Sequence, residues 1–374
     1  MGVAERGPHT GRRSPRAAIG SPLDEIATPT LVLDLPTARR NIELMGERFE
    51  HLSASLRPHV KAHKCAELAW LQIEHGAIGV TAATVAEADA MASAGVTDVL
   101  LANEVVGSAA MDRLAEVSGR ARITVAVDDR ENLIELARRA TSAGVTIGIV
   151  VELDVGMGRG GARTGDEALA LGRAATDLEG VELRGLLGYE GHCADEADPI
   201  ERERRTRESI GRLVDLAGRF GDDGLRTDVV SAGATGTYPI TGSIPGVTEV
   251  QAGSYVLMDR FHELLAPEFG FAVSVAATAI SAHGDLVVFD AGRKAVGTDF
   301  RPPTSPDGRG ELAFIHEEHV GYRYPRGARY RVGDRVSLIP DYAPTTVNLF
   351  GMFHVVEAGM VVDIWPVLAR HGGA

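Results

Sequence analysis

The stretch RITVAVDDRENLIELARRATSAGVTIGIVVELD, residues 122–154, contains the pattern that determines the fold. Two short runs rich in β-branched residues, 122–129 and 146–154, flank a segment of helical character. Nearly continuous apolar strands that alternate with helices are typical of a parallel sheet covered on both faces. This stretch therefore predicts one β–α–β unit.

The same alternation continues in both directions along the chain. Eight strand-like segments can be counted, at 55–61, 79–84, 98–105, 122–129, 146–154, 181–191, 227–234 and 248–255. Every gap holds a helical segment except the seventh, which is too rich in glycine and proline. Eight units in about 200 residues predict an α/β fold of the TIM-barrel type, (β/α)8. A doubly wound open sheet is the competing architecture, but such sheets usually stop at five or six strands.

The two ends of the chain differ from this pattern. Residues 1–25 contain arginine, glycine, proline and serine but no apolar core, so we expect a disordered leader and not a secretory signal. Residues 26–270 would form the barrel domain. After Gly270, strand-like segments such as GDLVVFDAG follow one another without helices, so residues 271–374 are predicted to form an all-β domain.

Charge and composition exclude several kinds of partner. The formal net charge of −14 argues against nucleic acid and against anionic membranes, because both require a basic face. No run of eighteen apolar residues is present to span a bilayer. Cys65 and Cys193 form no CxxC motif, which predicts a reducing cytoplasm. We therefore expect a small-molecule substrate.

Lysine is rare in this chain, and its rarity directs attention to one heptapeptide. Lys61, Lys64 and Lys294 are the only lysines, against 35 arginines, and two of them lie in PHVKAHK, residues 58–64. Arginine can replace lysine where only positive charge is needed. A Schiff base, in contrast, requires an amine that can lose its proton. Lys61 ends the first predicted strand, where barrel enzymes place functional residues.

The last two predicted strands end in loops suited to an anion. Their sequences SAGATGT, residues 231–237, and QAGSY, residues 251–255, offer hydroxyls and exposed amides. In isolation such loops are read as tight turns, but barrels often hold a phosphate after strands seven and eight. An amine together with a phosphate cradle is what pyridoxal 5′-phosphate requires. Strand alternation would also place His59 and His63 on the same face as Lys61 if the extended conformation persists that far.

With these motifs the chain resembles the fold-type III pyridoxal-phosphate enzymes related to alanine racemase, and within them the D-threonine aldolase and D-serine dehydratase group. The resemblance covers nearly everything after residue 25. The matching segments are TPTLVLDL, RPHVKAHK, ELDVGMGR, the YEGH of residues 189–192, SAGATGT, TEVQAGSYVLMD, DAGRKAV, HEEH and TVNL. RPHxKxHK is a specific signature, whereas the glycine-rich pieces are not specific singly.

The resemblance implies roles for individual residues. Lys61 would hold the cofactor as a Schiff base, and Arg159 would lie near its ring, where an arginine at the pyridine nitrogen keeps that nitrogen unprotonated. Lys64 would be a structural neighbour, and Lys294 is assigned no chemistry. The implied cofactor-binding set is Lys61, Arg159, Tyr189, Ser231, Gly233, Thr235, Gly236, Gly253, Ser254 and Tyr255, and the catalytic set is Lys61, His63 and His59.

One departure from the family concerns a divalent metal. The family binds it through a histidine and, two residues later, an acid or cysteine just ahead of the TVNL segment. Here those positions are Tyr342 and Pro344, which are poor ligands for zinc or manganese. We therefore expect no metal site there, and Asp341 with His354 is the alternative, displaced site. The HEEH of residues 316–319 lacks the HExxH spacing of a helical metal motif.

Three functions are compatible with these residues. The first is a lyase that converts a D-configured β-hydroxy-α-amino acid into glycine and an aldehyde, with a base such as His63, His192 or His319 in place of the metal. The second is a metal-independent racemase or epimerase, a transaminase-like enzyme or a D-serine dehydratase-like deaminase acting on another amino acid. The third is a non-catalytic cofactor carrier. The β domain argues against a carrier, because in the family it completes the active site across a dimer, so a homodimer is expected.

Overall fold

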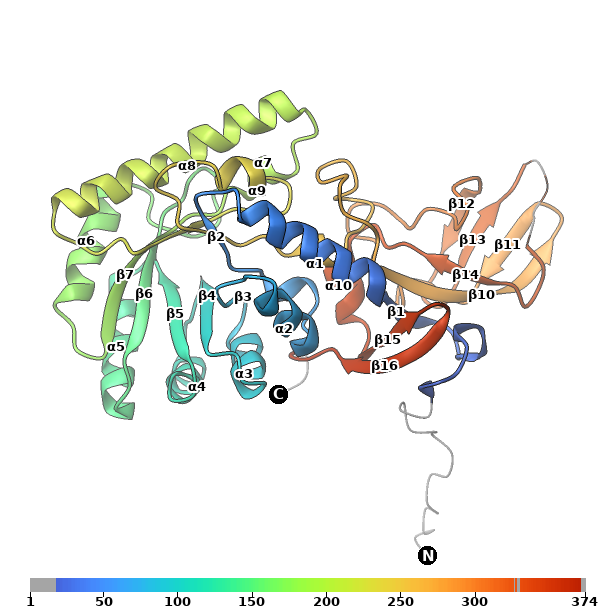
Figure 1. Cartoon of the computed structure of the whole chain (residues 1–374), viewed down its shortest axis with the longest axis horizontal. Helices are drawn as coiled ribbons and strands as arrows, with labels where there is room; N and C mark the ends of the chain where they lie inside the picture. The colour runs from blue at the N-terminus through green and yellow to red at the C-terminus, as the bar shows by residue number, and fades with distance from the viewer. Residues whose placement is uncertain (1–17, 326, 328–329, 371–374) are drawn as a thin grey trace, which may run out of the picture.

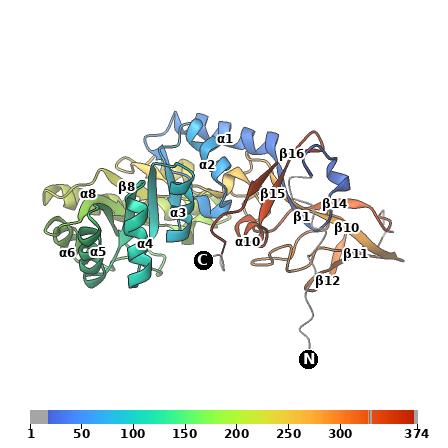
Figure 2. The same ribbon diagram turned by 90° about the horizontal axis from the view of Figure 1, so that it is seen from below.

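The computed structural model describes residues 18–325, 327 and 330–370. Two sheets organise these residues, a parallel sheet wrapped by helices and a mainly antiparallel sheet that lies to one side of it (Figure 1). The view from below shows the same division, with β1, β10, β14, β15 and β16 grouped beyond the barrel helices (Figure 2).

The parallel sheet confirms the predicted (β/α)8 barrel, because each of the eight expected segments contains one of its strands. Their order around the sheet is β2, β9, β8, β7, β6, β5, β4, β3. A parallel bridge between His59 and Thr81 joins the two ends of this order, so the sheet closes. The strands are β2 (Ser55–Leu56), β3 (Val80–Ala82), β4 (Asp98–Glu104), β5 (Arg122–Val127), β6 (Ile147–Glu152), β7 (Val181–Leu187), β8 (Val229–Ala232) and β9 (Glu249–Val250).

The helices between these strands follow from their sequences. In α5, for example, the Asp129 side chain caps the Asn132 N–H, and Gly144 ends the helix in the left-handed conformation. The seventh gap holds only the short α9, as its glycine and proline content predicts. The helices are α1 (Leu35–Phe49), α2 (Ala66–Glu74), α3 (Val85–Ser93), α4 (Ser108–Ser118), α5 (Arg130–Ala143), α6 (Gly165–Thr176), α7 (Gly191–Ala194), α8 (Pro199–Asp222) and α9 (Tyr238–Thr241).

The second sheet contains the predicted C-terminal strands together with one strand from the start of the chain. Its strands are β1 (Thr30–Asp34), β10 (Val273–His283), β11 (Leu286–Phe289), β12 (Glu311–Ile315), β13 (Val320–Arg323), β14 (Arg335–Leu338), β15 (Met352–Glu357) and β16 (Met360–Pro366). Helix α10 (Ala343–Asn348) lies between β14 and β15 along the chain. β1 pairs antiparallel with β10 and parallel with β15. The predicted boundary at residue 26 therefore needs a correction, because β1 belongs to the second sheet. Val32 packs there against Ala276, Val356 and Val361.

The predicted leader of residues 1–25 also needs a correction in its last part. Residues 1–17 lie outside the described residues, but 18–25 are held against the β15–β16 hairpin. The Gly20 N–H donates to the Val361 carbonyl at 2.8 Å, and the Val361 N–H donates to the Ser21 carbonyl at 2.9 Å. This segment ends in the 3-10 turn Leu23–Glu25. Within the described residues, no helix is both long and apolar enough to cross a membrane.

Candidate active site

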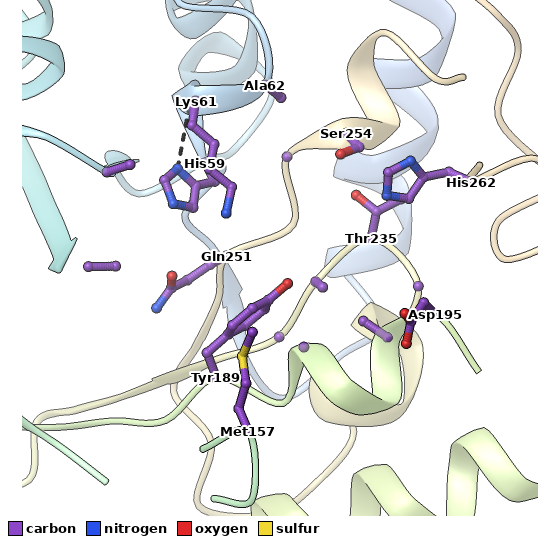
Figure 3. A pocket seen from close by; sticks show the side chains of 18 of the residues that line it. His59, Lys61, Ala62, Met157, Tyr189, Asp195, Thr235, Gln251, Ser254 and His262 are labelled. Carbon is purple, nitrogen blue, oxygen red and sulfur yellow. Dashed lines mark hydrogen bonds between the residues drawn. The ribbon is translucent and has the colours of Figure 1, made fainter. Parts of the chain in front are cut away.

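A cavity of about 400 Å³ opens at the carboxyl ends of the barrel strands. The barrel supplies most of its lining, and the β domain adds Phe300 and Tyr342. Figure 3 shows Lys61 and His59 on one side of this cavity, Tyr189 below, and Thr235 and Ser254 on the other side. The predicted site residues that line it are His59, Lys61, Arg159, Tyr189, Gly233, Thr235, Gly236, Gly253 and Ser254.

Lys61 has the properties of a reactive amine. Its Nζ lies 5.6 Å from the centre of the Tyr189 ring. Burial lowers the pKa of Lys61, the positive charge of Arg159 lowers it further, and Glu87 opposes both effects. A lowered pKa increases the fraction of the amine that is neutral near pH 7, and only the neutral amine is a nucleophile.

Of the two neighbouring histidines, His59 lines the cavity together with Lys61, whereas His63 does not, because the extended conformation does not persist that far. Residues Val60–Ala62 form a 3-10 turn, so strand alternation ends before His63. His63 is fully buried outside the cavity lining, with its Nε2 3.2 Å from Gln72 Oε1, and burial lowers its pKa to about 4. His59 does line the cavity, and its Nδ1 accepts from the Lys61 N–H at 3.4 Å (Figure 3). Burial lowers the pKa of His59 well below its usual value, so this ring is neutral.

The loop after β8 is built around a buried acid that the sequence reading missed. Glu190 is completely buried, and its carboxylate accepts bonds from the Gly233 N–H at 3.0 Å and from the hydroxyls of Thr237 at 2.8 Å and Thr241 at 2.6 Å. Gly233 has a φ of +91°, which favours glycine. The carboxylate thus fixes the curvature of a loop whose remaining amides can face an anion.

Two predicted cofactor-binding residues lie behind the cavity wall. Ser231 is fully buried and accepts a bond from Gln251 Nε2 at 2.8 Å. The Tyr255 hydroxyl accepts from Gln72 Nε2 at 2.8 Å, while its backbone N–H donates to Thr235 Oγ1 at 3.2 Å. Ser231 and Tyr255 therefore support the lining without belonging to it. Gln251, which had been assigned no role, lines the cavity.

A glycine is required where the eighth barrel strand meets the first. A Cβ on Gly253 would lie 2.5 Å from the His59 carbonyl oxygen, closer than packed atoms tolerate. The absence of a side chain lets the segment that carries Ser254 pack directly beside the Lys61 turn. This close approach brings the amine and the cradle into one cavity.

Arg159 lies over Tyr189 and beside buried acids. Its Cζ is 5.4 Å from the Tyr189 ring centre, and its Nη2 is 3.7 Å from Glu152 Oε1. Burial and, after it, the adjacent Glu104 carboxyl raise the pKa of Glu152 to about 8, whereas Arg159 opposes the change. The guanidinium therefore offsets acidic charge at the ends of β4 and β6.

An aromatic cluster forms the wall nearest the β domain. The rings of Phe261 and Phe300 stack with centroids 4.3 Å apart, and Tyr342 meets Phe300 edge-on at 5.2 Å. His262 stacks on Tyr342 at 6.0 Å, and its Nδ1 lies 2.6 Å from a carboxylate oxygen of Asp259. The sequence reading missed this cluster because its members come from three separate segments.

The residues at the family's metal position do not fit a divalent ion. Tyr342 is an aromatic neighbour of Phe300, and the Pro344 side chain has no donor atom. The displaced alternative also fails, because Asp341 binds Arg301 whereas His354 Nδ1 bonds the Thr30 hydroxyl. In the part of the chain that the structure describes, no group of three or more His, Cys, Asp or Glu side chains is arranged to hold a metal.

The other histidines named as possible bases lie outside the cavity. His192 Nε2 is 3.2 Å from the Ser209 hydroxyl on α8. His319 is exposed in the turn between β12 and β13, where the His316 N–H donates to its carbonyl at 2.8 Å. HEEH is thus a hairpin turn, and neither His192 nor His319 belongs to the cavity lining.

Comparisons with known proteins agree with this architecture. The chain matches the model of the alanine racemase N-terminal domain over residues 33–260 and that of a putative serine dehydratase domain over residues 272–356. It is 35% identical to a D-threonine aldolase from Arthrobacter sp, covering 95% of this chain and 96% of that protein. It is 32% identical to a 3-hydroxy-D-aspartate aldolase from Paracoccus denitrificans, with 93% of each chain covered.

Solved structures show the same relationship. The crystal structure of D-threonine aldolase from Filomicrobium marinum superposes with a TM-score of 0.89 at 33% identity, covering 94% of this chain and 98% of that one. D-threo-3-hydroxyaspartate dehydratase from Delftia sp. HT23 superposes with a TM-score of 0.78 at 27% identity, covering 94% and 100%. The chain therefore belongs to the alanine racemase-like, fold-type III family of pyridoxal-phosphate enzymes, in the group that contains D-threonine aldolase and the D-serine dehydratase-like enzymes.

Proposed function

We propose that this pyridoxal-phosphate-dependent lyase cleaves a D-configured β-hydroxy-α-amino acid into glycine and an aldehyde, and that it does so without a divalent metal. The observation that carries the proposal is the position of Lys61. Its amine, with a lowered pKa, shares one cavity with the glycine- and hydroxyl-rich loops after β8 and β9. The enzyme class follows from the family, whereas the exact substrate and the metal independence are proposals.

The cofactor would occupy the space between these two features. Lys61 would bind its aldehyde covalently, and Thr235, Gly236, Gly253 and Ser254 would bind its phosphate with amides and hydroxyls. Bound pyridoxal phosphate supplies an electron sink for the pair left at Cα when a bond there breaks. Tyr189 would pack near the ring, since it lies within 5.6 Å of the lysine amine.

The proton of the β-hydroxyl requires an acceptor, and we assign it to Lys61. With substrate bound, the Lys61 amine would lie at the reacting atoms, and because its pKa is lowered a larger fraction of it would be neutral and able to accept a proton. Lys61 would take the hydroxyl proton as the Cα–Cβ bond breaks and the aldehyde leaves. The same amine would then return a proton to Cα to give glycine. His63, predicted as a base, is too deeply buried to take part, and neutral His59 is left as a wall of the site.

The aromatic wall supports an apolar or aromatic substituent on the β-carbon. Phe261, Phe300 and Tyr342 occupy the side of the cavity where the family would hold its metal. Such rings favour apolar surface and do not solvate a second carboxylate. We therefore expect a β-aryl or β-alkyl substrate to be preferred over 3-hydroxy-D-aspartate, the substrate named for one relative.

A homodimer is also proposed. Phe300 is 56% exposed beside the cavity, and a second copy of the chain would cover it. The absence of a membrane partner or a nucleic-acid partner remains an expectation from the acidic charge, and a cytoplasmic location remains an expectation from the cysteines.

Product analysis by NMR tests the proposed function. Purified protein with pyridoxal phosphate would be incubated with D-threonine and with D-phenylserine, each with and without a chelator. Glycine plus the matching aldehyde, formed equally with the chelator, is the expected result. A 2-oxo acid plus ammonia would identify a dehydratase, and loss of Cα–H in D₂O without cleavage would identify a racemase. Borohydride reduction followed by peptide mass spectrometry should place the cofactor on Lys61.

A further inference from the structure

One polar pair in the cavity wall has no part in the function proposed above. His262 follows β9, and its neighbour Asp259 is completely buried. One Asp259 oxygen accepts from the His262 N–H at 2.9 Å and lies 2.6 Å from His262 Nδ1, while the other accepts from the Ala343 N–H at 2.8 Å. The carboxylate therefore fixes Nδ1 as the protonated, protein-facing nitrogen of the ring.

This arrangement leaves Nε2 of His262 for the cavity. The ring is held flat against Tyr342 and edge-on to Phe261, with centroids 6.0 and 5.1 Å apart. In Figure 3 it points toward Thr235 and Ser254, across the cavity from Lys61. A ring constrained on three sides, with one nitrogen directed into a cavity, is suited to binding a ligand.

The charge balance of the cradle indicates which ligand group this is. The loops at Gly233–Gly236 and Gly253–Ser254 offer only neutral amides and hydroxyls. The lysine and arginine that line the cavity, Lys61 and Arg159, come from the ends of other strands. Asp195, the carboxylate in the described lining, is exposed and adds negative charge. A phosphate dianion held by this set would gain strongly from one cationic donor, because charge-assisted hydrogen bonds are about twice as strong as neutral ones.

We propose that His262, positioned by Asp259, binds the phosphate group of the cofactor as a charged hydrogen-bond donor. The inference rests on the proposed function, since it requires the phosphate to lie in the cradle. In the protonated ring Nε2 carries a hydrogen directed at the phosphate oxygens, and Nδ1 keeps its bond to Asp259. Because Asp259 also binds the first N–H of α10, this contact links cofactor binding to the docking of the β domain.

Two substitutions of His262 separate charge from shape. His262→Asn keeps an N–H near the position of Nδ1, so the bond to Asp259 survives while nothing replaces Nε2. His262→Gln places a neutral amide near the position of Nε2. His283→Asn is the matched control, because His283 is exposed at the β10–β11 turn, outside the cavity lining.

The test is a titration of the apoenzyme with pyridoxal phosphate and, separately, with pyridoxal, which lacks the phosphate. We expect His262→Asn to lower the affinity for pyridoxal phosphate by about 10- to 100-fold, as for a lost hydrogen bond to a charged group. Its affinity for pyridoxal should stay unchanged. The affinity of His262→Gln for pyridoxal phosphate should lie between those of the wild type and His262→Asn. The ³¹P NMR signal of the bound cofactor should shift in His262→Gln and stay in place in His283→Asn.

Other outcomes overturn the proposal. Equal losses for the two ligands would show that His262 only packs the wall. Unchanged affinities with a loss of aldol cleavage would show that it acts on the substrate and not on the phosphate. A wild-type protein that binds neither ligand would contradict the proposed function itself. If the wild type binds both ligands and His262→Asn leaves the ratio of the two affinities unchanged, only this inference is overturned.

Discussion

The buried carboxylate of Glu190 accepts a hydrogen bond from the backbone N–H of Gly233 at 3.0 Å, and this bond determines the path of the loop after β8. Glu190 lies just after β7, and Gly233 lies just after the neighbouring strand β8. Two threonine hydroxyls complete its shell. The loop that we propose as the phosphate cradle therefore depends on a carboxylate placed behind it, which draws N–H and O–H donors inward and shapes the loop.

Replacing Glu190 with glutamine should loosen this loop. The amide keeps one acceptor oxygen, but its NH₂ group must then face a donor, the Gly233 N–H or a threonine hydroxyl. We expect Glu190→Gln to lower the free energy of unfolding by about 1.5–3 kcal/mol, the range for hydrogen bonds to a charged group, and to weaken cofactor binding. Denaturant unfolding measures the first effect. Glu179→Gln, at an exposed turn, is the control, and equal stabilities of the two variants would contradict the prediction.

Removing the charge of Arg159 should change how cofactor capture depends on pH. Burial lowers the pKa of Lys61, and Arg159 lowers it further. Without the guanidinium this pKa rises, so at a given pH a smaller fraction of the amine is neutral. We expect Arg159→Gln to need a higher pH for the same rate of pyridoxal phosphate capture, measured by absorbance. Arg163→Gln, whose side chain is half exposed, should keep the wild-type profile, and identical profiles for both variants would exclude the electrostatic effect.

Lys64 should matter for stability and not for chemistry. Its ammonium binds Glu87 at 2.5 Å and the Ala369 carbonyl at 3.1 Å, with both charged side chains at least 93% buried. Lys64→Met leaves the Glu87 carboxylate buried without its counter-charge, which typically costs about 3–5 kcal/mol. Urea denaturation measures this loss.

Lys294 provides the matched control for Lys64. It also pairs with a glutamate, Glu318, at 2.6 Å, but both side chains are more than half exposed. Exposed ion pairs contribute little to stability because solvent screens their attraction, so Lys294→Met should be nearly neutral. If the two methionine variants lost similar stability, the interpretation of the Lys64–Glu87 pair would be wrong.

Two substitutions at the family's ligand positions should create a divalent-metal site in this protein. Tyr342→His combined with Pro344→Asp supplies the histidine and acid that the family places at these positions. We expect the double variant to bind Mn²⁺ in isothermal titration calorimetry and the wild type to show no binding heat. Binding of Mn²⁺ by the wild type, with activity that fails in a chelator and returns with the ion, would refute metal independence.

The sequence predicted the barrel because the deciding signals are local. Eight apolar runs separated by capped helices repeat at short range, and each can be recognised alone. β1 was misplaced because its partners, β10 and β15, are far away in sequence.

The candidate site divides in the same way. Lys61 and the two cradle loops are carried by contiguous motifs at strand ends, so sequence reasoning could locate them. His63 was misjudged because Pro58 and the turn after it interrupt strand alternation. Glu190 and the Asp259–His262 pair could not be found, because their significance lies in contacts with Gly233, Thr237 and Ala343.

The position of β1 has a consequence for the order of events during synthesis. β1 is among the first ordered segments to leave the ribosome, yet its partner β10 begins about 240 residues later. At about 5–20 residues per second, β1 waits roughly 12–48 seconds before the edge that faces β10 can be paired, and longer for the edge that faces β15. Helix α1, joined directly to β1, can meanwhile settle on the growing barrel. An early strand thus stays unpaired until most of the protein has been translated.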